Sequence, residues 1–152
     1  MLLRWLLASL HLLALGIGFG AVAVRAGALH GPLTPDGLRR VFLADTFWGL
    51  AAILWIVTGL IRAFSTLEKG AAYYLHNGAF LLKMALLIVI LALEIWPMIT
   101  LIQWRLQLAR NQTPDTTAAG AIARISWVQA GLVVLMVFAA TAMARGLWAG
   151  VW

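Results

Sequence analysis

Four long apolar segments follow one another along the chain and are separated by short polar stretches. They cover about residues 2–24, 42–64, 74–104 and 122–147. Each is near or above the roughly 20 residues that an α-helix needs to cross the hydrocarbon core of a bilayer. Because a backbone inside lipid must satisfy its own hydrogen bonds, the segments are predicted to be helices rather than strands. The pattern predicts an all-α, integral membrane four-helix bundle that forms a single transmembrane domain over residues 1–152.

The connections between the apolar segments are short and rich in polar and turn-forming residues. They are predicted at residues 30–37, 65–70 and 111–117. Connections this short place consecutive helices side by side and antiparallel. The two termini are therefore predicted on one side of the membrane, and the first and third connections on the other side.

The composition agrees with a chain that lies in the bilayer. Hydrophobic residues make up 64% of it and charged residues 11%, against about 45–50% and about 25% in ordinary globular domains. Such a chain lacks the polar groups to cover a water-facing surface, so a soluble enzyme, a disordered tail and a nucleic-acid binder are excluded. The lipid bilayer is the expected partner. There is no Cys, which excludes disulfides and cysteine nucleophiles.

The basic residues predict an orientation in the membrane. The formal net charge is +6, and Lys or Arg is more frequent near the first and third connections than near the termini. The termini side carries Arg4, Arg62, Lys69 and Arg145, and the other side carries Arg25, Arg39, Arg40, Arg105, Arg110 and Arg124. Because cytoplasmic loops carry an excess of Lys and Arg, both termini are predicted outside the cytoplasm.

Tryptophan is abundant, with eight residues. Seven lie near the predicted membrane interfaces, where Trp concentrates as an anchor: Trp5, Trp48, Trp96, Trp104, Trp127, Trp148 and Trp152. The eighth, Trp55, falls in the middle of the second segment. Two roles are possible for Trp55 at this stage, namely packing in the bundle interior and a platform for a ligand.

Ionisable side chains inside the apolar segments carry the chemical information. Each costs roughly 2.5–3.5 kcal/mol at the centre of a membrane helix on insertion scales, and such residues normally face the bundle interior. Depth along each helix, at about 1.5 Å per residue, separates them into two layers. The termini-side layer holds His11, His76 and Lys83, and the loop-side layer holds Arg25, Asp45, Glu94 and Arg124.

The termini-side layer predicts a cofactor site. Two histidines on different helices, His11 and His76, suit the two sides of a haem b iron, with Arg62 among the basic residues that would meet the propionates. Burial lowers the pKa of a lysine, so Lys83 is the expected proton donor or acceptor and the candidate catalytic residue. A structural alternative stays open, in which Lys83 extends toward the interface and the histidines form hydrogen bonds between helices.

The loop-side layer favours structural ion pairs. Asp45 is expected to cap the start of the second helix, and Glu94 to pair with Arg25 or Arg124, because intramembrane charges usually pair with one another. The alternative is a proton relay through Glu94, which precedes the kink expected at Pro97.

Several sequence motifs carry a resemblance to a known family. They are Asp45–Gly49, Trp55–Arg62, Glu68–Gly70, Phe80–Lys83 and Met143–Gly146. With the Trp96-Pro97 and Trp104-Arg105 pairs, they resemble an uncharacterised bacterial integral membrane family, domain of unknown function 2214. This resemblance implies a multi-pass protein of the bacterial inner membrane, and the charge distribution given above then predicts periplasmic termini.

A more distant similarity is to the four-helix membrane protoporphyrinogen oxidases, which bind haem b. His11 and Lys83 match a first-span histidine and a third-span lysine of those enzymes. Leu81 stands where those enzymes carry a further histidine. The similarity implies the fold and a haem-binding pocket around His11 and Lys83.

Three functional hypotheses follow. The first is a redox protein that binds haem or a quinone-like ligand in a polar pocket around His11, His76 and Lys83. The second is a non-enzymatic membrane subunit or scaffold, whose Gly16/Gly20 and Gly49/Ala52/Gly59 faces bind partner helices. The third is a proton-coupled carrier that works as a homo-oligomer and uses Lys83 and Glu94. Whether the protein is an enzyme is open at this stage.

Overall fold

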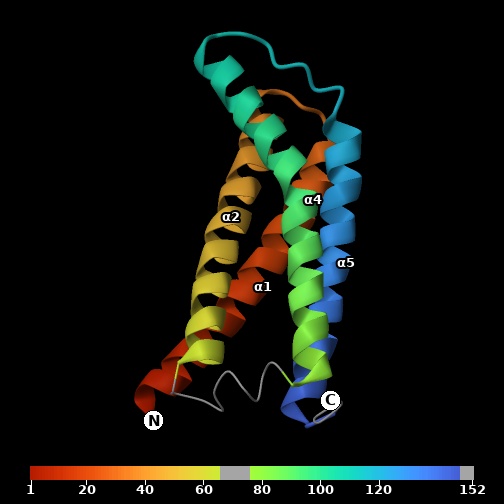
Figure 1. Cartoon of the computed structure of the whole chain (residues 1–152). Helices are drawn as coiled ribbons and strands as arrows, with labels where there is room; N and C mark the ends of the chain where they lie inside the picture. Colours follow the sequence, from red (N-terminus) through yellow and green to blue (C-terminus); the bar gives the residue numbers. More distant parts are fainter. Residues whose placement is uncertain (66–75, 148–152) are drawn as a thin grey trace.

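The protein is a bundle of long helices, which run up and down in sequence order (Figure 1). The computed structural model describes residues 1–65 and 76–147. Within these residues the helices are α1 (Leu2–His30), α2 (Pro35–Phe64), α4 (Gly78–Ala109) and α5 (Ala119–Ala144). All four are long and apolar enough to cross a membrane. The predicted all-α four-helix bundle is confirmed.

The helices are at least as long as the apolar segments that predicted them, and α1 and α2 are clearly longer. They contain 29, 30, 32 and 26 residues, whereas about 20 residues cross the hydrocarbon core. The sequence-based boundaries stopped at charged residues such as Arg25 and Arg40, but the backbone continues through both. α2 already begins at Pro35, where Thr34 accepts a hydrogen bond from the Gly37 amide and Pro suits the first helical turn. Asp45 therefore lies inside α2, and the expectation that it caps this helix is wrong.

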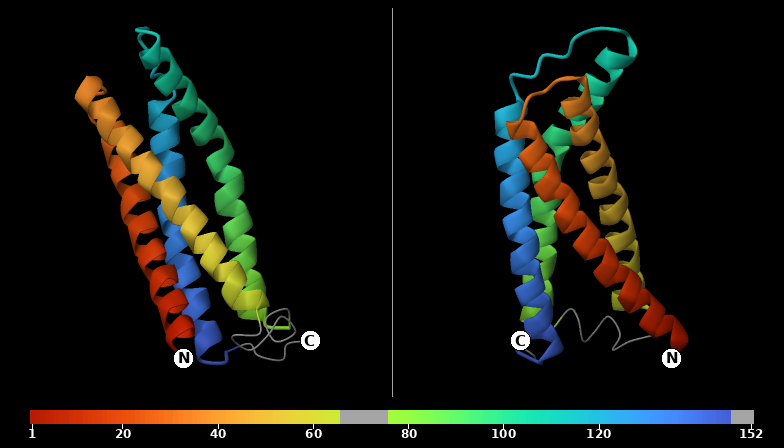
Figure 2. Two further views of the ribbon diagram at one scale, coloured as in Figure 1. Left: turned by 90° about the vertical axis from the view of Figure 1, so that its left-hand side faces the viewer. Right: turned by 180° about the vertical axis from the view of Figure 1, so that it is seen from behind.

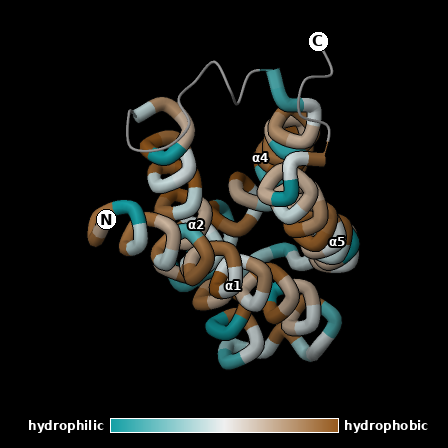
Figure 3. Tube along the Cα trace, turned by 90° about the horizontal axis from the view of Figure 1, so that it is seen from below, coloured by the Kyte–Doolittle hydropathy of each residue, from teal (hydrophilic) through white to brown (hydrophobic). Residues whose placement is uncertain are grey.

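Three pairs of the described helices pack closely, and they place the helices in the order α2, α1, α5, α4. α1 packs against α2 and α5, and α4 packs against α5 (Figures 2 and 3). α2 and α4 are not among the pairs that pack closely. α4 contains Pro97 and bends in its upper part (Figure 1), as expected where Pro removes a backbone hydrogen bond. The connection predicted at 65–70 lies outside the described residues, apart from Ser65.

The interior is apolar except at two levels. Near the α1–α2 and α4–α5 connections, Leu38, Leu101 and Ile122 belong to one buried cluster. In the middle of the bundle, Trp48 and Trp55 belong to a second cluster. Most large apolar side chains outside these clusters are exposed on the outer faces of the helices, as expected for a surface in contact with lipid.

Two of the predicted interfacial tryptophans contribute to this interior. Trp48 is 7% exposed and Trp104 is 3% exposed. The prediction that both are lipid-facing anchors is therefore wrong. Their depth along the helix is readable from the sequence, but their burial depends on how α2 and α4 are rotated toward the bundle axis. Trp148 and Trp152 lie outside the described residues.

Candidate functional site

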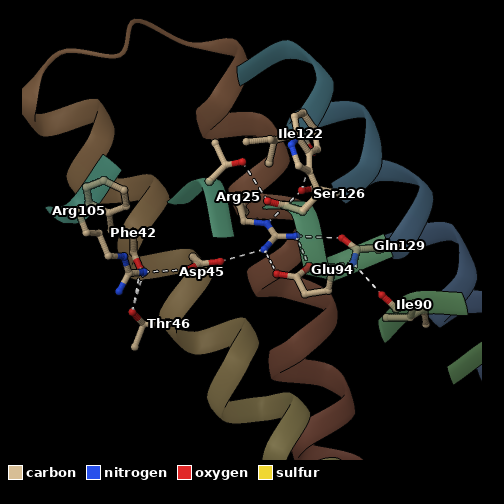
Figure 4. Close-up of polar contacts among 12 residues, drawn as sticks. Arg25, Phe42, Asp45, Thr46, Ile90, Glu94, Arg105, Ile122, Ser126 and Gln129 are labelled. Atoms are coloured by element: carbon tan, nitrogen blue, oxygen red, sulfur yellow. Dashed lines mark hydrogen bonds and ion pairs between the residues drawn. The ribbon is translucent and has the colours of Figure 1, made fainter. Parts of the chain in front are cut away.

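A fully buried arginine lies at the centre of the loop-side polar level (Figure 4). Arg25 on α1 donates from Nη1 and Nη2 to the two carboxylate oxygens of Glu94, at 2.7 and 2.8 Å. Its Nη1 also donates to Asp45 Oδ1 at 2.9 Å, its Nε to Ser126 Oγ at 3.0 Å and its Nη2 to Gln129 Oε1 at 2.9 Å. The paired bonds to Glu94 use the fork geometry that suits arginine and carboxylate.

The network continues toward α4 through a second arginine. Arg105 Nη2 donates to Asp45 Oδ2 at 2.8 Å and to the Phe42 carbonyl oxygen at 2.8 Å. On the other side, Gln129 Nε2 donates to Glu94 Oε2 at 2.8 Å. We call these six side chains the Arg25 network: Arg25, Asp45, Glu94, Arg105, Ser126 and Gln129.

The Arg25 network joins all four helices and balances its own charge. Its two arginines face two carboxylates, so the cluster as a whole is neutral. A buried charge is tolerated where it is paired and hydrogen-bonded, and Arg25 meets both conditions. Chemically, this arrangement is suited to hold the helices in register.

The structure does not bring Arg124 into this network. Arg124 is exposed on α5, and the pairing of Glu94 with Arg124 that the sequence left open is not seen. Arg124 is two residues from Ser126, which faces the bundle, and two helical residues span about 200°. Arg124 therefore points away from the interior, and of these two arginines it is Arg25 that pairs with Glu94.

The sequence does not predict three members of the network, namely Arg105, Ser126 and Gln129. It places Arg105 among the loop-side charges and in the Trp104-Arg105 pair, and it predicts no interior partner for it. Ser126 and Gln129 are spaced by three residues on one face of α5, which is a readable signal for a polar stripe. Their uncharged side chains carry no insertion cost comparable to that of a charge, so they did not stand out.

The termini-side level is built around His11 on α1. His11 is 7% exposed, and its Nδ1 lies 2.9 Å from the hydroxyl oxygen of Thr58 on α2. Its ring stacks on Trp55, with ring centroids 5.0 Å apart and an interplanar angle of 18°. A Cβ at Gly59 would lie 3.1 Å from His11 Cε1, so a glycine there gives the imidazole its space.

Lys83 on α4 meets the same aromatic ring. Its Nζ lies 5.1 Å from the centroid of Trp55, within the range of a cation–π interaction. His11, Trp55 and Lys83 all line a cavity of about 330 Å³, which we call the His11 cavity. Arg62, Met136 and Met143 also line it. His11, Lys83 and Arg62 therefore share one cavity.

His76 lies elsewhere. It is exposed just before α4 begins, and it is not among the described residues that line the His11 cavity. The structure therefore does not place the two predicted haem ligands on opposite sides of one space. The reason is that Asn77 caps α4 by accepting from the Ala79 and Phe80 amides, so His76 precedes the helix. Among the basic residues predicted to rim this level, Arg4 and Arg145 are exposed and Lys69 lies outside the described residues.

The partners of His11 were the part of this site that the sequence did not reveal. The sequence marks Trp55 as a mid-span residue and predicts Gly59 on a face for partner helices, but it does not single out Thr58. That assignment is wrong, because Gly59 faces His11 within the chain. The spacing along α2 is a signal for this site, because residues three and four apart lie on the same face of a helix. On a helix projection this face carries Trp55, Thr58 and Gly59.

A second cavity lies on the other side of Trp55. It measures about 320 Å³ and is lined by residues of all four helices, with Asp45 and Glu94 among them. We call it the Glu94 cavity. Gly49 and Ala52 line it as well, although the sequence placed them on a face for partner helices.

The fold and these two polar levels define a small α-helical membrane protein with ionisable groups such as His11 and Arg25 buried inside a four-helix bundle. The chain belongs to the family described as "Predicted membrane protein (DUF2214)", whose model matches residues 3–147. No curated protein and no solved structure gives a significant match.

Proposed function

We propose that the protein binds a planar, lipophilic redox ligand of the quinone class in the His11 cavity. The observation that carries the proposal is the indole N–H of Trp55. It is buried without a hydrogen-bond acceptor among the described residues, although Trp55 lines the cavity and contacts both His11 and Lys83. An unpaired buried donor costs about 1–3 kcal/mol, and a ligand carbonyl oxygen is the acceptor that it lacks.

The chemistry of the cavity supports the same ligand class. A quinone needs a flat apolar space for its ring and donors for its oxygen atoms, and the cavity combines Met136 and Met143 with His11 and Lys83. Lys83 is positioned to supply or accept a proton beside the ligand, and Arg62 adds a second cation to the lining. Proton exchange at Lys83 is the enzymatic role that we assign within this proposal.

Haem b is the alternative occupant of the same cavity. His11 would supply one axial ligand, and Met136 or Met143 would supply the other, since His and Met are both usual axial ligands. This alternative is consistent with the similarity of His11 and Lys83 to positions of the protoporphyrinogen oxidases. It gives no role to His76, because His76 does not line the His11 cavity.

The test is a binding measurement on the purified full chain in detergent, with duroquinone as the probe. Trp55→Phe removes the indole N–H and keeps an aromatic ring, and Trp127→Phe makes the same change at an exposed position of α5. We expect Trp55→Phe and Lys83→Met each to weaken binding about 5- to 10-fold, the loss expected for one hydrogen bond. Trp127→Phe should leave binding unchanged. Equal affinity in all four proteins, or no binding to the wild type, would refute the quinone proposal.

An optical spectrum of the same preparation separates the two occupants. Protein isolated from haem-replete cells should show no Soret band if the ligand is a quinone. A Soret band that is lost in His11→Leu and retained in His76→Leu would instead assign the cavity to haem b.

A non-enzymatic subunit that binds partner helices or forms a homo-oligomer is the second candidate function. An outward groove of about 700 Å³ between α1 and α2 favours it. Gly16 and Gly20 line this groove, and a Cβ at either glycine would meet nothing within 4 Å. Glycines with such open space beside them suit the close approach of another membrane helix. Cross-linked dimers that are lost in Gly16→Phe/Gly20→Phe, with duroquinone binding intact, would establish this role beside the first.

The proton-coupled carrier is less well supported. Lys83 lines the His11 cavity, whereas Glu94 is held by both nitrogens of the Arg25 fork, so the two residues lie at different polar levels. Proton flux into liposomes that is lost in Lys83→Ala is the result that would restore the carrier hypothesis.

We further propose that the chain lies in the bacterial inner membrane with periplasmic termini. The excess of Arg near the α1–α2 and α4–α5 connections supports this orientation. Because the chain has no Cys, single cysteines at Arg4 and Gln112 can be labelled one at a time in intact cells. An impermeant maleimide should label Arg4→Cys and should not label Gln112→Cys, and the reverse pattern would invert the orientation.

A further inference from the structure

The Glu94 cavity is large and predominantly apolar. Leu15, Trp48, Ile56 and Val133 are among the side chains that line it. Asp45 and Glu94 are the charged groups among its described lining residues, and both are already paired with Arg25. The polar end of the cavity is therefore neutral as a whole, and it does not call for a charged ligand.

The Glu94 cavity and the His11 cavity adjoin each other. Three side chains line both of them, namely Leu15, Trp55 and Met136. The two cavities therefore share part of their walls. Trp55 and Asp45 are ten residues apart on α2, which corresponds to about 15 Å along the helix. Together the two adjoining cavities extend over roughly this length, from the polar level at His11 to the Arg25 network.

The Glu94 cavity borders the side on which the bundle is least tightly closed. α2 and α4 both line it, yet they are not among the helix pairs that pack closely (Figure 2). Ile53 on α2 and Leu91 and Met98 on α4 line the cavity and are also exposed on the outer surface. Because exposed apolar positions of membrane helices are expected to face lipid, these three residues border the cavity on the side that faces the bilayer.

We infer that the ligand of the His11 cavity carries a long apolar tail of the isoprenoid or alkyl type, and that this tail lies in the Glu94 cavity after entry between α2 and α4. The inference rests on the proposed function and specifies its ligand class. The ring lies against Trp55, His11 and Lys83, and the tail extends along α2 toward Asp45. Burying a tail in an apolar cavity on the side that faces the bilayer requires no charged partner, in agreement with the neutral Arg25 network.

The experiment compares two ligands that share a head group. Duroquinone has no tail, and a decyl-substituted benzoquinone has one. Gly49→Phe places a ring in the Glu94 cavity at a position where a Cβ meets nothing within 4 Å. Gly16→Phe is the matched control, because a Cβ there also meets nothing within 4 Å and Gly16 lines the outer groove instead. Ala52→Leu fills the same cavity if Gly49→Phe does not fold.

We expect Gly49→Phe to weaken binding of the decyl-substituted quinone at least 10-fold and to change duroquinone binding less than 2-fold. Gly16→Phe should change neither. An unchanged affinity of Gly49→Phe and Ala52→Leu for the tailed quinone would overturn the inference while the proposed function stands. Loss of both ligands to the same extent would also overturn it, because the substitution would then act on the head-group site.

Failure of the proposed function has a different signature, since the wild type would then bind neither quinone. Mass spectrometry of the purified protein distinguishes a further source of an apolar tail. A phospholipid retained by the wild type and by Gly16→Phe, but lost from Gly49→Phe, would overturn the inference and assign the Glu94 cavity to a lipid acyl chain.

Discussion

Replacing Arg25 with methionine should destabilise the bundle strongly. The substitution removes five hydrogen bonds, made to Ser126, Asp45, Gln129 and twice to Glu94. Asp45 keeps Arg105 as a partner at 2.8 Å. Glu94 keeps the Gln129 amide but loses its cation, so it becomes the buried charge without a partner.

The expected decrease in the free energy of unfolding follows from the unpaired carboxylate of Glu94. Removing one partner of a buried ion pair costs about 3–5 kcal/mol. An ordinary polar contact between membrane helices averages about 0.6 kcal/mol in double-mutant cycles. The two values are far enough apart to be distinguished by experiment.

The assay is reversible unfolding of the purified protein in mixed micelles, with a denaturing detergent as the titrant and helicity as the signal. Arg124→Met is the matched control, because it makes the same change at an exposed position and should alter the free energy of unfolding by less than about 0.5 kcal/mol. Arg25→Met combined with Glu94→Met removes both charges. This double variant should recover most of the lost stability, since buried ion pairs replaced by apolar side chains are often neutral.

Two results would refute the reasoning. One is a stability of Arg25→Met within about 1 kcal/mol of Arg124→Met, which would make the network an ordinary contact. The other is a double variant that is no more stable than Arg25→Met. That outcome would show that the unpaired charge of Glu94 is not the origin of the loss.

Three further predictions concern the termini side and the α4–α5 connection. Gly59→Leu should displace the His11 ring, because even a Cβ there lies 3.1 Å from His11 Cε1. It should reduce duroquinone binding at least 5-fold, whereas Gly16→Leu should not, and equal binding by the two variants would contradict the role of Gly59. Asn77→Ala removes the cap of α4 and should lower the free energy of unfolding by about 1 kcal/mol, so an unchanged value would argue against the cap. The backbone amide of Thr117 donates a hydrogen bond to the Asp115 carboxylate, which holds the pKa of Asp115 below its usual value. The contribution of this turn to stability should therefore be present above the pKa of the unfolded chain and be lost as the pH falls through the lowered pKa. If an NMR titration finds the pKa of Asp115 at or above that of an aspartate in an unstructured peptide, this stabilising hydrogen bond is refuted.

The sequence by itself determined the elements and the kind of solvent around them. The length and apolarity of the four segments leave helices in a bilayer as the stable arrangement, because lipid offers no hydrogen-bond partners to the backbone. The cost of burying charge also marked Arg25, Glu94, His11 and Lys83 as residues that face the interior. Depth along each helix was readable too, since the rise per residue is constant.

Only the tertiary structure decided which of these residues meet. Periodicity fixes the direction of a side chain around its own helix, but not the rotation of that helix against its neighbours. Arg124 has the depth of the Arg25 network and points away from it, and His76 precedes α4 and does not line the His11 cavity. Thr58 and Gln129 carry no charge that would mark them in a sequence, yet one bonds His11 and the other bonds Arg25. The contacts at both polar levels depend on helix packing, and packing is decided by all four helices together.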